Sequence, residues 1–278
     1  MTLEPYHFKL GKFKCIAIRD GGHMGSADVI FCNAPEQELI QALQRHNLKA
    51  DQLASSWTCL LVDTGETILL IDTGVGSEIT AGGNLLRQLV EEGYPAETID
   101  MVFLTHGHPD HIGGCTDTNG KLIFENARYL MGKTEYEFWT SNENLSSLGE
   151  MMGQFARKNL PAIQEHVQLL DGDEEVLPGV KVVKAFGHTP GHLGLEIRSQ
   201  GQMLLNLADV ALHPLHLEYP EWYAKVDIQP ERMVATRHDL LEQAAKIGAK
   251  VLLFHFDFPS IGYVMQDGDT WRWRSVLE

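Results

Sequence analysis

The stretch THGHPDHIGG at residues 105–114 holds three histidines and an aspartate within six positions, directly after a short apolar run. In a helix His106 and His108 would point to different faces, but in a loop that leaves a strand they can converge on one ion. Asp110 and His111 can then reach a second ion. The alternative is a polar turn with solvated histidines, which would have no matching ligands elsewhere in the chain.

Three further candidate ligands lie downstream of this stretch. His188, Asp209 and His255 each follow a predicted strand. Strand ends at one edge of a sheet can converge, so these residues and the 105–114 stretch could form a single site. The sequence therefore predicts a metal centre, although the spacing alone does not prove it.

The composition disfavours several classes of partner. With 278 residues and 44% hydrophobic content the chain can bury a sizeable core. A net charge of −16 disfavours binding to nucleic acid and to anionic membranes, because both would repel the protein. We therefore expect a small neutral or apolar substrate. Residues 1–14 show no signal-peptide pattern, and no stretch approaches the roughly 20 apolar residues of a membrane span. We therefore expect a cytoplasmic protein that does not bind a membrane.

Short apolar runs between turn residues predict strands in both halves of the chain. Helical spacing that ends at glycine predicts helices over 84–93 and 230–247. This pattern indicates two sheets packed face to face with helices outside. The segments 133–159 and 213–229 fit such a core poorly, so we expect them to cover the substrate. The predicted strands are 13–18, 57–62, 67–71, 101–104, 180–186, 193–197, 203–207 and 251–254, followed by a hairpin of 263–266 and 271–274.

The candidate ligands resemble those of the metallo-β-lactamase superfamily, whose signature H-x-H-x-D-H matches residues 106–111. The resemblance runs from about residue 57 to 263 and includes the turn LIDTG at 70–74. It implies a single domain over residues 1–278 with that family's α/β fold, a four-layer αβ/βα sandwich of two mixed β-sheets. It also implies that one metal is held by His106, His108 and His188, a second by Asp110, His111 and His255, and that Asp209 bridges them.

The resemblance further implies a hydrolase with two divalent metal ions. Nitrogen and oxygen ligands suit zinc first, and also manganese, iron or cobalt. Two such ions can share a hydroxide made from water, which is the expected nucleophile, and Asp110 and Asp209 are the expected catalytic carboxylates. Antibiotic-hydrolysing members commonly carry cysteine where this chain has Asp209, so a β-lactamase is a less favoured alternative. A non-catalytic metabolite sensor is another.

Some polar residues near the ligands have two interpretations. Asp72 is either a turn former or an acceptor that orients a ligand histidine, and the resemblance favours the second. Thr105 and His192 also have two interpretations, packing in the core or orienting a ligand histidine. His213 and His216 are expected to be loop histidines, because the seven ligands already account for both metals.

Within the superfamily the sequence is most similar to the branch of methyl parathion hydrolase and related lactonases, through motifs at 69–76, 137–139 and 186–192. Three residues after Asp209, the best-known acyl-homoserine lactonases have a tyrosine, whereas this chain has Leu212. We expect a lactone or ester substrate, with N-acyl homoserine lactones among the candidates. A phosphotriesterase is the alternative. Relatives are often dimers, so a homodimer is an open possibility.

The expected substrate pocket includes Phe138, Trp139, Leu212 and Tyr223. For the three aromatic residues, packing in the core is the alternative. His23, in a glycine-rich loop, is expected to be a flexible surface histidine that could border the pocket.

Overall fold

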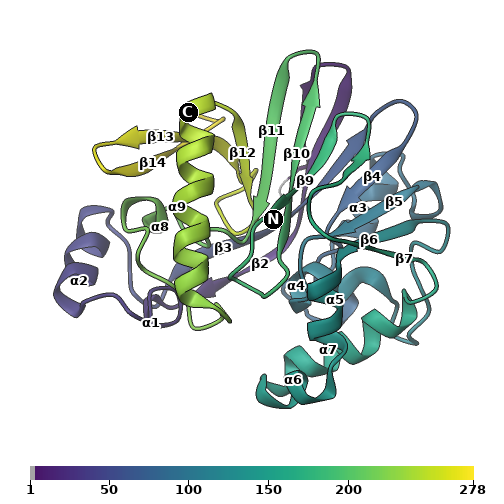
Figure 1. Ribbon diagram of the computed structural model, residues 1–278, viewed down its shortest axis with the longest axis horizontal. Helices are drawn as coiled ribbons and strands as arrows, with labels where there is room; N and C mark the ends of the chain where they lie inside the picture. Colours follow the sequence, from purple (N-terminus) through teal and green to yellow (C-terminus); the bar gives the residue numbers. More distant parts are fainter. Residues whose placement is uncertain (1–3) are drawn as a thin grey trace.

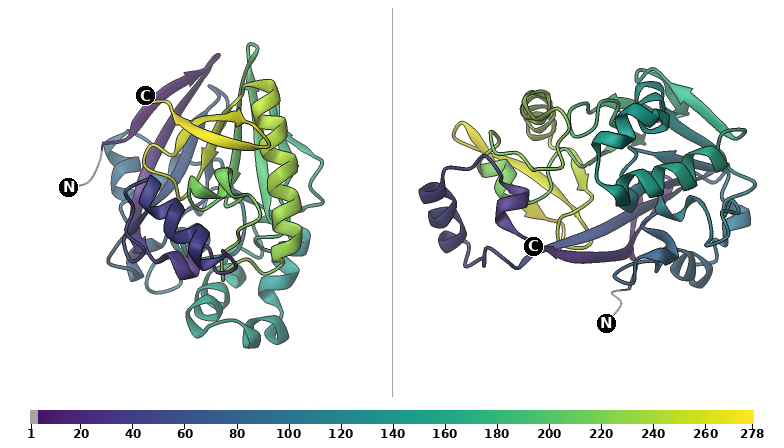
Figure 2. Two further views of the ribbon diagram at one scale, coloured as in Figure 1. Left: turned by 90° about the vertical axis from the view of Figure 1, so that its left-hand side faces the viewer. Right: turned by 90° about the horizontal axis from the view of Figure 1, so that it is seen from below.

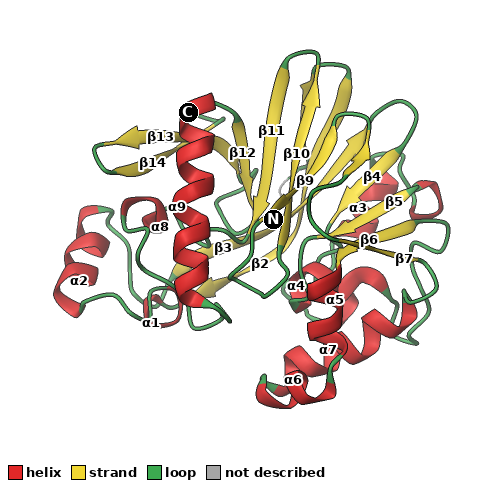
Figure 3. Cartoon of the chain, in the orientation of Figure 1, coloured by secondary structure: helices red, strands yellow, loops and turns green. Residues whose placement is uncertain are grey.

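The computed structural model describes residues 4–278. Residues 1–3 lie outside this range, and they begin the segment 1–14 in which the sequence predicts no signal peptide. Two mixed β-sheets of seven strands each pack face to face, with helices on their outer sides (Figure 1, Figure 3). The predicted fold class is confirmed. No helix between residues 4 and 278 is long and apolar enough to cross a membrane.

The first sheet contains β1 to β7 in chain order, antiparallel from β1 to β4 and parallel from β4 to β7. Its longest strand, β2, extends past the predicted 13–18 because it stays paired with β3 beyond a register shift between Arg19 and Gly21. The strands are β1 (Tyr6–Leu10), β2 (Phe13–Gly25), β3 (Leu53–Asp63), β4 (Ile68–Ile71), β5 (Met101–Leu104), β6 (Arg128–Gly132) and β7 (Val167–Leu170).

The second sheet has the order β14-β13-β12-β11-β10-β9-β8 and is antiparallel except for the parallel pair β11 and β12. The long helix α9 (Pro230–Ile247) lies between the two strands of that parallel pair in the chain. The strands are β8 (Glu175–Leu177), β9 (Val180–Lys184), β10 (Leu193–Ser199), β11 (Gln202–Ala208), β12 (Lys250–Leu253), β13 (Ile261–Asp267) and β14 (Thr270–Ser275).

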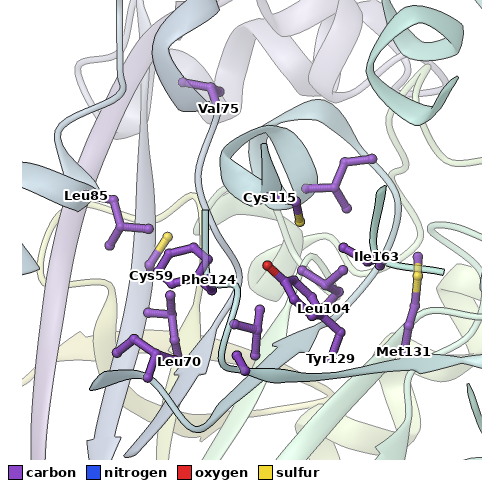
Figure 4. Close-up of a cluster of buried hydrophobic side chains, with 14 of the residues drawn as sticks. Cys59, Leu70, Val75, Leu85, Leu104, Cys115, Phe124, Tyr129, Met131 and Ile163 are labelled. Carbon is purple, nitrogen blue, oxygen red and sulfur yellow. The ribbon is translucent and has the colours of Figure 1, made fainter. Parts of the chain in front are cut away.

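Alternating side chains of the buried strands build the layers. In β5, Met101 and Phe103 face the core between the two sheets, whereas Val102 and Leu104 face the core under the outer helices. Figure 4 shows part of this outer core, where Leu104 lies near Tyr129. Because both faces of β5 are covered, the strand is apolar throughout, as expected for a strand in the middle of such a sandwich.

Helices α3 to α7 pack on the outer face of the first sheet, and α9 packs on that of the second. Helix α9 begins at Pro230 and ends before Gly248, which adopts a positive φ of 63° as a C-terminal cap, and these are the predicted bounds. Helices α1 and α2 lie at the opposite end of the molecule from α5, α6 and α7 (Figure 1, Figure 2). The helices are α1 (Ala27–Ile30), α2 (Glu36–Arg45), α3 (Leu85–Glu91), α4 (Pro109–Ile112), α5 (Lys133–Thr140), α6 (Asn142–Ser147), α7 (Glu150–Ala162), α8 (Leu215–Glu218) and α9 (Pro230–Ile247).

The segment 133–159 differs from its expected role as an element outside the core. It forms three helices, and Trp139, Leu145 and Leu160 from them are buried in the core on the outer side of the first sheet. The expected poor fit to the core was wrong, because apolar residues of these helices belong to it. The expected role in covering the substrate stays a prediction. The second segment, 213–229, contains α8 and a loop that packs beside α1.

Helix α9 also anchors the loop that follows β11. The buried Arg237 guanidinium donates hydrogen bonds to the carbonyl of Val210 at 2.7 Å, to that of Pro220 at 2.9 Å, and to that of Trp222. These carbonyls point inward and have a cation as their donor. Arg237 therefore holds the backbone of this loop at three points.

We expect Arg237→Met to lower the free energy of unfolding by about 3 kcal/mol, because it leaves buried carbonyls without donors. Urea denaturation monitored by circular dichroism measures the change. Lys246→Met, which removes an exposed cation from the same helix, is the control and should shift stability by less than about 0.5 kcal/mol. Equal stability of the two variants would contradict this role of Arg237.

Candidate metal centre

Strand ends bring the predicted ligands together. His106 and His108 follow β5 of the first sheet, whereas His188, Asp209 and His255 follow β9, β11 and β12 of the second. The centre therefore lies where the two sheets meet at one edge. Its ligands come from both sheets, so the packing of the sheets fixes the distances between ligands.

The short helix α4 changes the direction of the chain within the first ligand stretch. His108 is extended, with φ −69° and ψ 152°, and Pro109 then starts the helix, a position that suits its fixed φ. Asp110 and His111 lie within this helix. The chain thus changes direction between His108 and Asp110, which lets one motif serve two neighbouring sites.

The first cluster contains His106, His108, His188 and Asp209, whose potential ligand atoms lie within 4.8 Å of one another. Nδ1 of His108 is 3.0 Å from Nε2 of His106 and 2.9 Å from Nε2 of His188. The Asp209 carboxylate is 3.2 Å from Nε2 of His188. All four side chains are buried, and their polar atoms face one another.

The second cluster contains Asp110, His111 and His255, again within 4.8 Å. Asp209 borders it too: Oδ2 is 3.0 Å from Nε2 of His255 and Oδ1 is 3.4 Å from Nε2 of His111. Its carboxylate therefore lies between the two clusters. The backbone aims it there, because a register shift between β11 and β12 precedes Ala208, whose φ is 43°.

The donor set fits two divalent cations. Nε2 of His111 and Oδ1 of Asp209 are buried and have no hydrogen-bond partner among the described residues, which is costly unless a ligand satisfies them. Imidazole nitrogens and carboxylate oxygens in this number suit zinc, manganese, iron or cobalt. The centre is a His/Asp cluster of the kind that holds a pair of metals.

Three of the histidines are oriented through their second ring nitrogen. Nδ1 of His111 is 2.8 Å from Asp72, and Nδ1 of His188 is 2.7 Å from Asp227. Nδ1 of His255 is 2.9 Å from the Ser55 hydroxyl. Such partners fix the ring and leave Nε2 directed at the centre.

Asp227 and Ser55 have no recognisable signal in the sequence. Asp227 lies in the loop before α9, where its Oδ2 also accepts a hydrogen bond from the Ala224 amide at 2.7 Å. Ser55 lies on β3, far from His255 along the chain. Only the folded structure brings each of them to its histidine, whereas Asp72 could be suspected because it belongs to a motif.

Electrostatics at the centre favour a positive charge between the clusters. Burial lowers the pKa of His106 and of His108 well below the ordinary value. Burial also acts to lower the pKa of His188, but Asp209 and Asp227 outweigh it and raise that pKa to about 9. Burial disfavours ionisation of Asp209, yet His255 and the other adjacent imidazoles hold its pKa well below the usual range.

The structure defines the contacts of Thr105 and His192, whose roles the sequence left undecided. The Thr105 hydroxyl donates to Asp72 at 2.9 Å, so it supports the acceptor of His111. His192 is buried against the His106 ring, with centroids 4.9 Å apart, and burial lowers its pKa to about 3. It therefore packs as a neutral ring beside the ligands.

The two histidines after Asp209, His213 and His216, are buried. His216 accepts a hydrogen bond from the Leu212 amide at 3.2 Å through Nδ1, and its Nε2 is 3.1 Å from the carbonyl of Ile30. Nδ1 of His213 accepts from the Leu215 amide. Neither belongs to the metal clusters.

A cavity of about 140 Å³ opens onto the centre. Leu212 lies on its wall, and so does His23, whose ring also packs near Trp57 with centroids 5.6 Å apart. The ligands His108, Asp110, His188, Asp209 and His255 form its floor. Ser55 and the apolar residues Val29, Ile30, Met152, Leu212, Ala224 and Val226 complete the lining.

Three residues expected in the pocket lie outside this lining. Trp139 is buried, and its ring packs edge-on against His108 with centroids 5.4 Å apart, so it lies behind a ligand. Phe138 packs against the outer core of the first sheet. Tyr223 is half-buried, and its amide donates to Asn33 at 2.8 Å.

Curated proteins similar to this chain include lactonases. An N-acyl homoserine lactonase of Bacillus cereus is 29% identical over 171 residues, covering 54% of this chain and 62% of that protein. A probable metallo-hydrolase of Bacillus subtilis is 27% identical over 197 residues, covering 64% of this chain and 73% of that protein. The chain thus spans less than two thirds of the length of the lactonases that it matches.

Two solved structures share the fold over nearly the whole chain. AidC, a dizinc quorum-quenching lactonase in complex with the product N-hexanoyl-L-homoserine, has a TM-score of 0.90 and 26% identity, covering 98% of this chain and 97% of AidC. The hydrolase AbOPH has a TM-score of 0.91 and 24% identity, covering 99% and 98%. Residues 56–277 match the family model described as the metallo-β-lactamase superfamily, and the chain belongs to that superfamily.

Proposed function

We propose that the protein is a dinuclear metal-dependent hydrolase that opens lactones, with N-acyl homoserine lactones as the first candidate substrates. The observation that carries the proposal is the Asp209 carboxylate, which lies between two imidazole clusters at the floor of a largely apolar cavity. The similarity to lactonases supports the choice of substrate class.

The seven ligands would hold two ions, with Asp209 shared between them. Bound divalent ions would activate water at neutral pH and polarise the carbonyl oxygen of the substrate. Zinc is the first candidate because of the donor set, and the dizinc neighbour supports it. The first ion would be held by His106, His108 and His188, and the second by Asp110, His111 and His255.

The side chains of the protein orient this chemistry. Asp72, Asp227 and Ser55 fix three ligand rings, so the ligand nitrogens are in place before substrate arrives. Asp110 is 19% exposed at its side chain and lines the cavity, whereas Asp209 is 2% exposed. Asp110 is therefore the carboxylate placed to pass a proton to the departing alkoxide.

The cavity favours a neutral substrate with an apolar group. Six apolar side chains line it, and the net charge of −16 disfavours polyanions. With Leu212 in place, no hydroxyl is available at that position of the wall to bind a developing oxyanion. His23 is the lining imidazole that belongs to neither metal cluster, so it is the candidate donor.

A phosphotriesterase of the methyl parathion hydrolase type is the second candidate. The aliphatic Leu212 on the cavity wall favours it, because that branch also has an aliphatic residue there. A metal pair serves phosphoryl and carbonyl centres by the same means. The shape of the apolar wall, and not the metal centre, would then decide between the two substrates.

Asp72→Asn should weaken metal binding about 10- to 100-fold, because it removes the carboxylate that orients His111. Asparagine tolerates the positive φ of 60° at this position, so the fold should be retained. Competition with a chelator measures the affinity. Asp239→Asn, at an exposed position of α9, is the control, and equal affinities of the two variants would contradict the orienting role.

Metal analysis of the purified protein by mass spectrometry should give about two ions per chain, because the two clusters share Asp209. Asp209→Ala should reduce the count and abolish most turnover while circular dichroism stays that of the parent. A parent value close to one ion would exclude the dinuclear centre.

A substrate panel with products identified by mass decides the substrate class. We expect the zinc-loaded protein to open N-acyl homoserine lactones with a mass gain of one water, faster than it cleaves aryl esters, phosphotriesters or β-lactams. Faster phosphotriester cleavage would favour the second candidate. Absence of turnover on the whole panel would refute the hydrolase proposal and favour a metabolite sensor.

A further inference from the structure

A buried carboxylate lies behind the first cluster and is outside the seven-ligand set. Glu135 of α5 is 0% exposed. Its Oε1 accepts hydrogen bonds from the Gly107 amide at 2.9 Å and from Nε1 of Trp139 at 2.6 Å. Its Oε2 accepts from the Gly191 amide at 2.8 Å. No lysine, arginine or histidine of the described chain forms an ion pair with it.

The two amides belong to two different ligand loops. Gly107 stands between His106 and His108, after a strand of the first sheet. Gly191 follows His188 by three residues and precedes a strand of the second sheet. One carboxylate therefore ties the loops of both sheets together at the point where they supply the three histidines of the first cluster.

The glycines let α5 approach both loops directly. A Cβ atom at Gly107 would lie 2.4 Å from the Trp139 ring, and one at Gly191 would lie 2.2 Å from the amide nitrogen of Glu135. Either contact is far shorter than van der Waals distance. Because Trp139 in turn packs edge-on against His108, the contacts of Glu135 reach a ligand ring as well as two ligand loops.

We propose that Glu135 is a positioning residue of the metal centre, which fixes the loop of His106 and His108 relative to that of His188 and adds a buried negative charge that strengthens cation binding there. The inference rests on the proposed metal centre. A buried carboxylate without a cationic partner is costly, and its amide donors offset only part of that cost. A divalent ion in the adjoining cluster would offset more.

The test uses the full chain and Zn²⁺ alone, followed by Co²⁺ for spectroscopy. Glu135→Gln keeps the shape but removes the charge and turns one acceptor into a donor that faces an N–H group. We expect one of the two Zn²⁺ equivalents to bind about 10- to 100-fold more weakly in chelator competition. The Co²⁺ absorption bands should change too, since the ligand geometry changes. Glu137→Gln, exposed on the same helix, is the control and should match the parent.

Trp139→Phe is the second variant, because Glu135→Gln could fail to fold. It keeps an aromatic ring and removes a single donor, so it should weaken binding of the same equivalent severalfold. The inference is overturned if a folded variant binds both Zn²⁺ equivalents with the parent's affinity and gives the parent's Co²⁺ spectrum. This holds even where the variant is less stable than the parent.

The outcomes also separate this inference from the proposed function. A parent protein that binds two ions but opens no lactone would refute the lactonase proposal and leave the role of Glu135 testable by affinity and spectrum. A parent that binds fewer than two ions would refute the dinuclear centre itself.

Discussion

The position of the Asp209 carboxylate between two imidazole clusters is the constraint on which the rest of the structure depends. A buried carboxylate needs positive charge or hydrogen-bond donors around it, and here histidines from both clusters surround it. The kink at the end of β11 and the Arg237 contacts in the following loop hold the backbone that carries it. The geometry of the centre is thus built into the chain path.

Because the ligands come from two sheets, the metal centre and the core between the sheets are coupled. Phe103 of the first sheet and Leu252 of the second share the inter-sheet core, a few residues before His106 and His255. Any shift of one sheet against the other would separate the ligands. Glu135 adds a direct tie between the two sheets at the same edge.

The sequence predicted what depends on local pattern. Alternating and continuous apolar runs located most strands, and the bounds of α9 followed from Pro230 and Gly248, which suit the two ends of a helix. It did not predict that the helices of 133–159 belong to the core, because their aromatic residues fit a core and a substrate lid equally well. The contacts of Asp227 and Ser55 were also invisible, since each joins residues far apart in the chain.

By itself the sequence determined the candidate metal ligands, because they occur in a dense motif and directly after apolar strands, and its resemblance to the superfamily indicated the fold. Tertiary structure alone decided which atoms face one another, which side chains orient the rings, and which residues line the cavity. Leu212 lies on the wall of the cavity, whereas Trp139 lies outside its lining, although both are near ligand residues. The physical reason is that ligand identity is a local property, whereas ring orientation and cavity shape arise from packing between distant segments.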